Sequence, residues 1–449
     1  MHSYRGNMEE RHRLLLTKQN PWWKNEYPTL PVFERDLYHT LLTFIDNKQI
    51  LAIVGLRRVG KTIIMKQLIK RLKTKQNNIC YISFDDIDFQ KYTIAEDLIN
   101  YFLEYSDKHT TRYLFLDEIQ KLPHWPDLIK TIYDTEENIK IIISGSASLD
   151  LQRNKETLAG RILTFHLPVL TFPEYLRYHS LPHALTTNSI IHDFDVSFAE
   201  KKDRYQEAFT AYLIKGAFPE LLDVGIQENE YIKKYIKESI IEKAIVDIAR
   251  ITKEDEKIIY ELFRLLSNST ARLFEIVNLA NILAVNRNRI SRCLSLLEQA
   301  FLLKITYNYT RSVAKQVRTN KKQYAAHSCI VMTLLDYPVE VINTELAGHL
   351  VEGIIAHTVD AKSFWRTPQK DEIDIIVQEK EILPIEIKYQ TQITSDDTKT
   401  LLKFCKKFKC KNGIVVTKNS LEKKIVEGVE ILFIPAWLFP LYWIHRKKQ

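Results

Sequence analysis

The chain has 449 residues, which is too many for one hydrophobic core and suits two to four domains. Apolar residues make up 45% of it and charged residues 27%, an ordinary globular composition that excludes wholesale disorder. The formal net charge is +8 at pH 7. This excess of basic residues favours a polyanionic partner such as nucleic acid, although charge alone does not decide.

Two further features concern the cellular setting. No apolar run approaches the roughly 18 residues that a membrane span needs, and the N-terminal residues lack the apolar core of a secretion signal. The five cysteines form no Cys-x-x-Cys pair, and most lie within apolar patterns. Because such thiols suit a reducing compartment, we expect a cytoplasmic protein with no membrane partner.

The first chemical motif lies between an expected strand and an expected helix. Residues 49–55 form a short apolar run typical of a buried parallel strand, and a helical pattern occupies 63–72. The sequence between them reads Gly-Leu-Arg-Arg-Val-Gly-Lys-Thr, a Walker A pattern. Backbone N–H groups of such a loop turn inward around phosphates, and the helix N-terminus adds partial positive charge. A chance Gly-Lys-Thr turn is the alternative for this motif taken alone.

The loop predicts a bound ATP with Mg²⁺. Lys61 is expected to reach the β- and γ-phosphates as a catalytic residue, and Thr62 to give an oxygen to Mg²⁺. The two arginines of the loop either touch the nucleotide or face solvent. The residues expected to bind the nucleotide are Gly55, Leu56, Arg57, Arg58, Val59, Gly60, Lys61, Thr62, Ile63 and Ser144.

An acidic motif follows a second short apolar strand at 113–116. It consists of Asp117 and Glu118, about 55 residues after the loop, which is a Walker B pattern. We expect Asp117 to bind Mg²⁺ directly or through water, and Glu118 to orient or deprotonate the attacking water. An acidic strand end that caps a helix is the alternative, but the two motifs in their expected contexts favour the ATPase.

Two more strands are expected at 79–84 and 140–143. The second leads into Ser144-Gly145-Ser146, and a polar residue at this strand tip is placed to sense the γ-phosphate. A plain transition from strand to turn explains these serines equally well. Ligands of open parallel sheets bind at the carboxyl ends of the strands, where all these polar residues fall.

The chain resembles a family of archaeal and bacterial AAA-type ATPases. The resemblance rests on GLRRVGKT, LFLDEIQ, SGSASLDL and LAGR (Leu158–Arg161), and the stretches Asn20–Trp23 and Phe33–Asp36 are similar to the family's leader. It implies that a winged-helix segment and a restriction-endonuclease-like domain follow the ATPase. It also implies that Arg161 senses or stabilises phosphate as a catalytic residue, in cis or as a finger from a neighbour; a structural salt bridge is the alternative. The two leader tryptophans either pack on the adenine or attach the arm to the core.

The middle of the chain reads as helical. Residues 180–203 are polar and pattern-poor, so we place a domain boundary there, and apolar spacing predicts helices at 204–222, 230–251, 256–266, 273–283 and 287–301. The last two fit a helix-turn-helix. The segments 302–309 and 311–324 then form a basic wing suited to phosphate contacts. The alternative is a module that contacts protein.

A carboxylate motif lies in the C-terminal part. Strands are expected at 363–366, 372–377 and 383–389, after a helix at 345–359, and Asp374 with Glu386 and Lys388 resembles the PD-(D/E)xK nuclease motif. Alternation puts Glu386 and Lys388 on one face. The carboxylates, with Glu352 from the helix, are expected to hold Mg²⁺ or Mn²⁺, while Lys388 orients a water. An amphipathic hairpin with a Glu–Lys pair is the alternative.

We therefore expect an α/β fold, a P-loop NTPase parallel sheet with flanking helices, followed by an all-α and winged-helix region and a small α/β domain. The expected function is ATP hydrolysis acting on DNA or RNA, with a metal-dependent nuclease site. The alternative is a regulatory ATPase whose later domains are protein-interaction scaffolds. The sequence leaves open whether copies of the chain assemble. The expected domains are an arm at 1–36, the ATPase core at 37–180, a helical segment at 203–252, the winged helix at 253–325 and the nuclease-like domain at 340–449.

Overall fold

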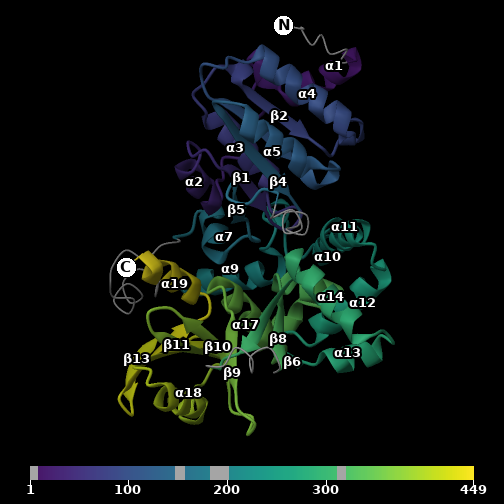
Figure 1. Ribbon diagram of the computed structural model, residues 1–449. Coiled ribbons are helices and arrows are strands. Elements are labelled where there is room, and N and C mark those ends of the chain that lie inside the picture. Colours follow the sequence, from purple (N-terminus) through teal and green to yellow (C-terminus); the bar gives the residue numbers. More distant parts are fainter. Residues whose placement is uncertain (1–8, 147–156, 183–201, 311–319, 449) are drawn as a thin grey trace. The chain divides into compact units, whose positions relative to one another are not determined.

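The computed structural model describes residues 9–146, 157–182, 202–310 and 320–448, and it divides into two compact units, Met1–Pro168 and Val169–Gln449 (Figure 1). Most of the stretch 180–203, where we expected a domain boundary, lies outside these residues, as does much of the expected wing. Every helix in the described ranges is too short or too polar to cross a membrane.

The first unit is built on a five-stranded sheet in which every pairing is parallel. The strand order is β2-β3-β4-β1-β5. Strands β1 to β3 are almost completely buried because helices lie on both faces of the sheet (Figure 1), which explains their unbroken apolar sequences. This confirms the expected P-loop NTPase fold. The strands are β1 (Ile50–Val54), β2 (Ile79–Ser83), β3 (Arg112–Asp117), β4 (Ile139–Gly145) and β5 (Ile162–His166). The main helices are α2 (Asp36–Thr43), α3 (Lys61–Arg71), α4 (Tyr92–Tyr105) and α5 (Trp125–Thr135).

The N-terminal arm covers the edge strand β2. After α1 (Glu10–Gln19), the Asn20 side chain donates to the backbone oxygen of Tyr81 at 2.8 Å and accepts from its N–H at 2.6 Å. The indole N–H groups of Trp22 and Trp23 both donate to the oxygen of Ile79, at 3.0 and 2.8 Å. These side chains satisfy a strand edge that would otherwise be open to pairing. Because Ile79 begins β2, the tryptophans lie at the amino end of the strand and attach the arm there, away from the nucleotide edge.

The second unit begins with helices. The helix predicted at 204–222 is shorter in the structure, where α9 ends at Lys215. Pro219, which has no N–H to continue an α-helix, begins a short 3₁₀ turn instead. The helices are α7 (Phe172–Tyr178), α9 (Lys202–Lys215), α10 (Asn229–Tyr235), α11 (Lys243–Thr252), α12 (Glu256–Asn268), α13 (Ile276–Ile282) and α14 (Arg287–Gln299), with a π-helical stretch at Ile236–Glu242 between α10 and α11.

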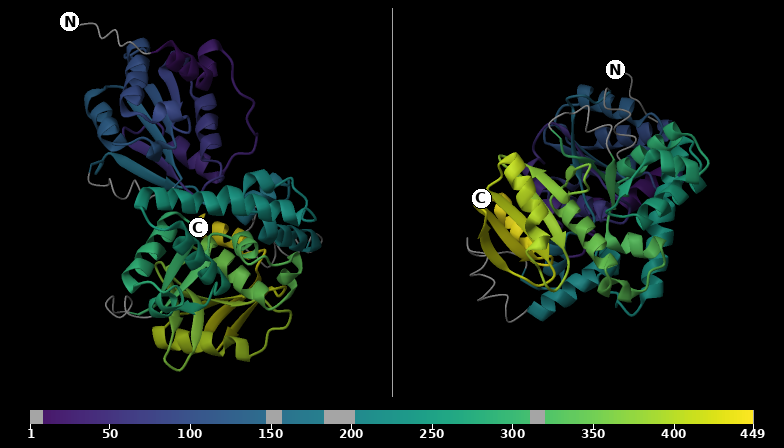
Figure 2. Two further views of the ribbon diagram at one scale, coloured as in Figure 1. Left: turned by 90° about the vertical axis from the view of Figure 1, so that its right-hand side faces the viewer. Right: turned by 90° about the horizontal axis from the view of Figure 1, so that it is seen from below.

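A nine-stranded mixed sheet runs through the rest of this unit (Figure 2), in the order β13-β14-β12-β11-β10-β9-β7-β8-β6. The strands of the expected wing, β7 and β8, are therefore part of the same sheet as the expected nuclease-like strands. The joint is the parallel pairing of β7 with β9, at Tyr307–Ser363 and Asn308–Phe364. The bounds are β6 (Leu273–Phe274), β7 (Leu303–Asn308), β8 (Lys321–Ala325), β9 (Ser363–Arg366), β10 (Glu372–Gln378), β11 (Ile382–Lys388), β12 (Asn412–Thr417), β13 (Glu422–Val426) and β14 (Val429–Pro435).

The described part of the second unit also contains the helices α16 (Ser328–Leu334), α17 (Leu346–Thr358), α18 (Asp396–Phe408) and α19 (Phe439–Lys448). The strand β13 was not predicted. It is an edge strand with exposed lysines, so it lacks the apolar alternation that identifies a half-buried strand.

Candidate nucleotide site and C-terminal carboxylate cluster

The phosphate-binding loop follows β1 and begins at a position where only glycine fits. A Cβ on Gly55 would lie 2.3 Å from the backbone oxygen of Leu167, whose N–H donates to Val54 at 2.7 Å. At the other end, Gly60 has φ +100° and is the N-cap of α3. The end of β5 and the start of α3 therefore fix the loop on both sides.

Two basic side chains hold the loop from within. Lys61 is buried, and its Nζ donates to the backbone oxygens of Gly55 and Leu56, both at 3.0 Å. Arg35 donates to the oxygen of Val59 at 2.6 Å and to that of Pro168 at 2.8 Å. No role for Arg35 was predicted beyond its place in the leader stretch. Because this buried arginine joins the loop carbonyl of Val59 to the carbonyl of Pro168 after β5, it is a positioning residue for the loop.

The carboxylate of Asp117 is surrounded by hydroxyl groups. Its Oδ2 accepts from Thr62 Oγ1 and from Tyr81 Oη, each at 2.7 Å, and its Oδ1 accepts from Ser144 Oγ. These donors come from α3, β2 and β4, whose polar ends meet at the carboxyl edge of the sheet. Burial raises the pKa of Tyr81, so its hydroxyl stays protonated and donates. Sequence reasoning did not select Tyr81, because it reads as a core residue of an apolar strand.

Glu118 adopts a left-handed backbone conformation, with φ +54°. Its N–H donates to Ser144 Oγ at 3.2 Å, and its carboxylate accepts from Gln120 Nε2 at 2.6 Å. Gln120 also donates to Ser146 Oγ at 3.0 Å. Strained backbone of this kind is concentrated at functional sites. The structure thus brings both candidate serines to the acidic motif.

The donor set at this edge fits a hard divalent cation. Thr62 presents a hydroxyl oxygen and Asp117 a carboxylate, and both are oxygen ligands of the kind that Mg²⁺ takes together with waters and phosphates. The hydroxyl donors that hold Asp117 are uncharged, so they leave its negative charge available to a cation.

Arg161 does not lie at this edge. Its backbone oxygen accepts from the N–H of Ile50, the first residue of β1, whereas the phosphate-binding loop follows the last residue of that strand. Its guanidinium forms two hydrogen bonds with Asp134, at 2.9 and 3.0 Å. The structure therefore corrects the expectation that Arg161 acts on the phosphates of its own chain, because Arg161 and the phosphate-binding loop lie at opposite ends of β1.

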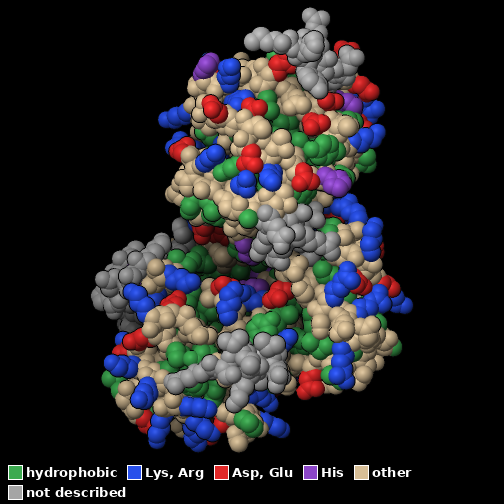
Figure 3. Space-filling model, viewed as in Figure 1, with side chains coloured by type: hydrophobic (Ala, Val, Ile, Leu, Met, Phe, Trp, Pro, Cys, Tyr) green, Lys and Arg blue, Asp and Glu red, His purple; other side chains and the backbone are tan. Residues whose placement is uncertain are grey.

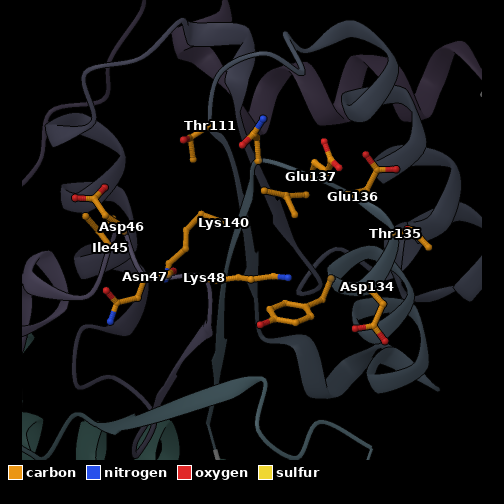
Figure 4. A pocket seen from close by; sticks show the side chains of 13 residues that line it. Ile45, Asp46, Asn47, Lys48, Thr111, Asp134, Thr135, Glu136, Glu137 and Lys140 are labelled. Atoms are coloured by element: carbon orange, nitrogen blue, oxygen red, sulfur yellow. The ribbon is translucent and has the colours of Figure 1, made fainter.

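A pocket of about 670 Å³ opens at this amino-terminal edge, and Asp134 is among its lining residues (Figure 4). Lys140, which also lines it, donates to the backbone oxygens of Phe44, Asn47 and Gln49 at 3.0, 2.5 and 2.8 Å. These bonds fasten the start of β4 to the segment before β1. The pocket is distinct from the phosphate-binding loop.

The second carboxylate cluster surrounds Lys322 of β8, whose side chain is 2% exposed. Its Nζ lies 3.0 Å from Glu352 Oε1, 2.6 Å from Glu372 Oε1 and 3.1 Å from Asp374 Oδ1. Tyr324, two residues along the strand and on the same face, donates to Glu352 Oε1 at 2.8 Å. Two side chains of β8 thus reach one carboxylate of α17.

The remaining motif residues make their own contacts. Asp374 Oδ2 accepts from the N–H of Ile387 at 2.9 Å. Lys388 Nζ lies 2.8 Å from Glu386 Oε1, and the buried Glu386 Oε2 has no hydrogen-bond partner among the described atoms.

The electrostatics of this cluster follow from burial. Burial, and then the neighbouring Asp374, raise the pKa of Glu352 to about 8 against the opposing effect of Lys322. The same two causes raise the pKa of Glu386 to about 8. Burial lowers the pKa of Lys322, but Glu352 and Asp374 outweigh it and hold that pKa well above the usual value.

The structure therefore distributes the expected nuclease residues over two pairings. Glu352 and Asp374 contact Lys322, whereas Glu386 contacts Lys388. Within the described ranges, no group of three or more His, Cys, Asp or Glu side chains is arranged to hold a metal ion. Sequence reasoning missed Glu372 and assigned Lys322 to a phosphate-binding wing. The signal for both residues was their spacing. Glu372 lies two residues before Asp374, and Lys322 lies two residues before Tyr324, so the side chains of each pair lie on the same face of their strand.

The basic side chains of the second unit fall into two groups. On α14, Arg289 and Arg292 lie 3.0 and 3.3 Å from the carboxylate of Glu254, and Arg292 also donates to the oxygen of Thr252. On and after α18, a second group is exposed, and Lys and Arg side chains gather over this helix at the bottom of the view (Figure 3). Its members are Lys399, Lys403, Lys406, Lys407, Lys409 and Lys411.

Three segments of the chain match known families. Residues 47–176 match the family described as "AAA domain", so the first unit carries an AAA-type P-loop domain. Residues 206–340 match "Domain of unknown function (DUF8612)", and residues 344–437 match "Domain of unknown function (DUF4143)".

The chain also has relatives over most of its length. It is 28% identical over 417 residues to "Uncharacterized protein MJ1637" of Methanocaldococcus jannaschii, and the aligned part covers 87% of this chain and 84% of that protein. It is 24% identical over 416 residues to an "Uncharacterized protein" of Haemophilus influenzae, with 89% and 96% covered.

Similarity to solved structures is low in overall superposition. The Aeropyrum pernix ORC1 protein in complex with DNA is 13% identical, with 75% of this chain and 94% of that one covered and a TM-score of 0.29. AMPPCP-bound DnaA from Aquifex aeolicus is 14% identical, with 60% and 89% covered and a TM-score of 0.24.

Proposed function

We propose that the protein is an ATPase that binds ATP with Mg²⁺ at the loop Gly55–Thr62 and hydrolyses it with Glu118. The observation that carries this proposal is the hydrogen bond of 2.7 Å between Thr62 Oγ1 and Asp117. It joins the helix that follows the loop to the end of the strand that carries the acidic motif. A hydroxyl and an acid so placed are the pair that holds Mg²⁺ in P-loop NTPases. The AAA domain match over residues 47–176 supports the same proposal.

Each side chain of the site then has a defined task. The backbone N–H groups of the loop and Lys61 bind the phosphates, and Thr62 and Asp117 provide oxygen ligands. Bound Mg²⁺ neutralises charge on the transferred phosphoryl group. Glu118 orients the attacking water and accepts its proton, and Ser144 fixes both acids because it contacts the Asp117 carboxylate and the Glu118 N–H.

Two variants test the ATPase. Lys61→Ala removes the charge that binds the phosphates, so we expect ATP binding and turnover both to be lost. Glu118→Gln keeps the shape of the side chain and removes its basicity, so we expect ATP to bind and to be hydrolysed slowly. Binding is measured with a fluorescent ATP analogue and turnover by phosphate release. Normal turnover in both variants would refute the assignment.

We further propose that this ATPase acts on nucleic acid, DNA or RNA. The net charge of +8 and the exposed lysines on and after α18 support a polyanionic partner. The chain order of α12, β6, α13, α14 and the β7–β8 hairpin is typical of a winged helix. The contacts of Arg289 and Arg292 with Glu254 reduce the charge that α14 itself offers.

The alternative is a regulatory ATPase whose second unit contacts protein. The two proposals differ in salt dependence, because phosphate contacts release counterions when they form. We expect binding to single- or double-stranded oligonucleotides that weakens as salt rises, and further in Lys403→Ala/Lys406→Ala/Lys407→Ala. Asp396→Ala/Asp397→Ala is the matched control on the same helix, and we expect it to bind no more weakly than wild type. Retention that is absent at low salt would favour the regulatory ATPase.

A further inference from the structure

We propose that the C-terminal carboxylate cluster is a cation site filled by the chain's own Lys322 ammonium, so that it takes no divalent metal. This goes beyond the proposed ATPase and does not depend on it. It also replaces the expected metal-dependent nuclease chemistry by a structural role for the cluster.

The geometry matches the ammonium group atom for atom. A lysine ammonium has three N–H donors and no acceptor. Three carboxylate oxygens, one each from Glu352, Glu372 and Asp374, lie 2.6–3.1 Å from Nζ. These acids come from α17 and β10, so one cation is coordinated by two elements outside its own strand. Two of these contacts are hydrogen bonds, to Glu352 and Asp374, and the contact with Glu372 is an ion pair.

The position of the ammonium is set by the sheet. Lys322 pairs with Leu273 of β6 on one side and with Thr306 of β7 on the other, so β8 has a neighbouring strand along both edges at this residue. The side chain also passes over the ring of Phe364 of β9, 5.8 Å from its centre. The pairing therefore fixes the backbone of Lys322, and the buried side chain points toward the acids of α17 and β10.

The ammonium competes with a metal ion for the cluster. Asp374 uses both of its oxygens, because Oδ1 contacts Lys322 and Oδ2 accepts from the N–H of Ile387, while Glu352 Oε1 contacts Lys322 and Tyr324 and Glu386 Oε1 contacts Lys388. A divalent cation bound to the remaining oxygens of Glu352 and Glu386 would lie beside the Lys322 ammonium, whose positive charge repels it. An ammonium is not a Lewis acid, so it does not lower the pKa of a water as a bound metal ion would.

The cluster instead fastens β8 to α17 and β10. A buried lysine without its acids, or the acids without the lysine, leaves an uncompensated charge in a site that water hardly reaches. The predicted wing and the predicted nuclease-like part are thereby one cooperative body, joined through Lys322 as well as through the β7–β9 pairing.

The test is calorimetric titration of the full-length protein with Mn²⁺ in the absence of nucleotide. Mn²⁺ binding by wild type should be unchanged in Asp374→Asn, because the ammonium already occupies the cluster. Lys322→Ala should gain a Mn²⁺ site with at least tenfold tighter binding than any in wild type, and Lys322→Ala/Asp374→Asn should lose it. Lys322→Met, which keeps most of the apolar stem, is the second variant if Lys322→Ala does not fold.

Two results overturn the proposal. One is a Mn²⁺ site in wild type that disappears in Asp374→Asn, which would place a metal beside Lys322. The other is a folded variant at residue 322 that gains no Mn²⁺ binding. Because nucleotide is absent throughout, neither result depends on whether the protein hydrolyses ATP.

Discussion

Asp117 in the first unit and Asp374 in the second are both strand carboxylates of a recognised motif, yet their surroundings differ. Asp117 accepts hydrogen bonds from the hydroxyls of Thr62, Tyr81 and Ser144. Asp374 contacts the ammonium of Lys322. Hydroxyls hold a carboxylate in place and leave its charge available, whereas an ammonium neutralises it. The donors around a carboxylate, more than the motif it belongs to, therefore decide whether a metal can bind.

The largest effect is expected from Glu118, the proposed catalytic carboxylate of the first unit. Glu118→Gln should lower the rate of ATP hydrolysis by roughly 100- to 10,000-fold, the usual contribution of a positioned general base. ATP affinity should stay near that of wild type, because the loop and Lys61 are unchanged. Phosphate release in single-turnover experiments measures the rate. A hydrolysis rate equal to wild type in Glu118→Gln would show that another group activates the water.

The next effect is on stability and concerns the second unit. Lys322→Met removes the ammonium that Glu352 and Asp374 contact, whereas Glu372 keeps its ion pair with Arg366, so we expect the variant to lower the free energy of unfolding by about 3–5 kcal/mol. Urea unfolding followed by circular dichroism measures this.

Lys321→Met is the matched control for that experiment, because it removes a neighbouring lysine whose side chain lies over the Tyr307 ring on the other face. We expect Lys321→Met to change stability far less. Equal stability of the two variants would mean that the contacts of Lys322 add nothing beyond those of a surface lysine.

A smaller effect is expected from the hydroxyl contacts of Asp117. Tyr81→Phe removes one hydrogen bond to the carboxylate, a loss of about 0.5–1.5 kcal/mol, which corresponds to roughly a 2- to 13-fold change. We expect the Mg²⁺ concentration for half-maximal turnover to rise, while ATP binding without Mg²⁺ stays the same. An equal loss of both would instead indicate a general disturbance of the sheet.

The smallest effect is expected at Arg161. Its partner is Asp134 at the edge opposite the loop, so Arg161→Ala in dilute protein should leave ATP binding and turnover unchanged. Turnover is measured over a range of protein concentrations. A rate that rises with concentration in wild type and not in Arg161→Ala would show that the residue acts on a neighbouring chain.

The sequence predicted the first unit well because its signals are local. An apolar strand, a glycine-containing loop and a helix follow one another in the segment around Lys61. In the second motif, Asp117 and Glu118 come directly after the apolar residues of their strand. The position of Tyr81 against Asp117 was not predictable, because it depends on the lateral order of β2 and β3.

The second unit was predicted less completely because its arrangement depends on contacts between segments far apart in the sequence. Its helices and most of its strands follow from periodicity, but the pairing of β7 with β9 joins segments more than 50 residues apart through backbone contacts alone. Lys322 was interpreted as a solvent-facing base in a basic run. Only its position between β6 and β7, beside Glu352, shows that it points inward.

The most direct measurement is the number of Mn²⁺ ions bound per chain, determined by electron paramagnetic resonance with saturating ATP and the Glu118→Gln variant to slow hydrolysis. The predicted result is one ion per chain that requires nucleotide, disappears when Asp117→Asn is added and persists when Asp374→Asn is added. A second ion that remains without nucleotide and disappears with Asp374→Asn would contradict the account.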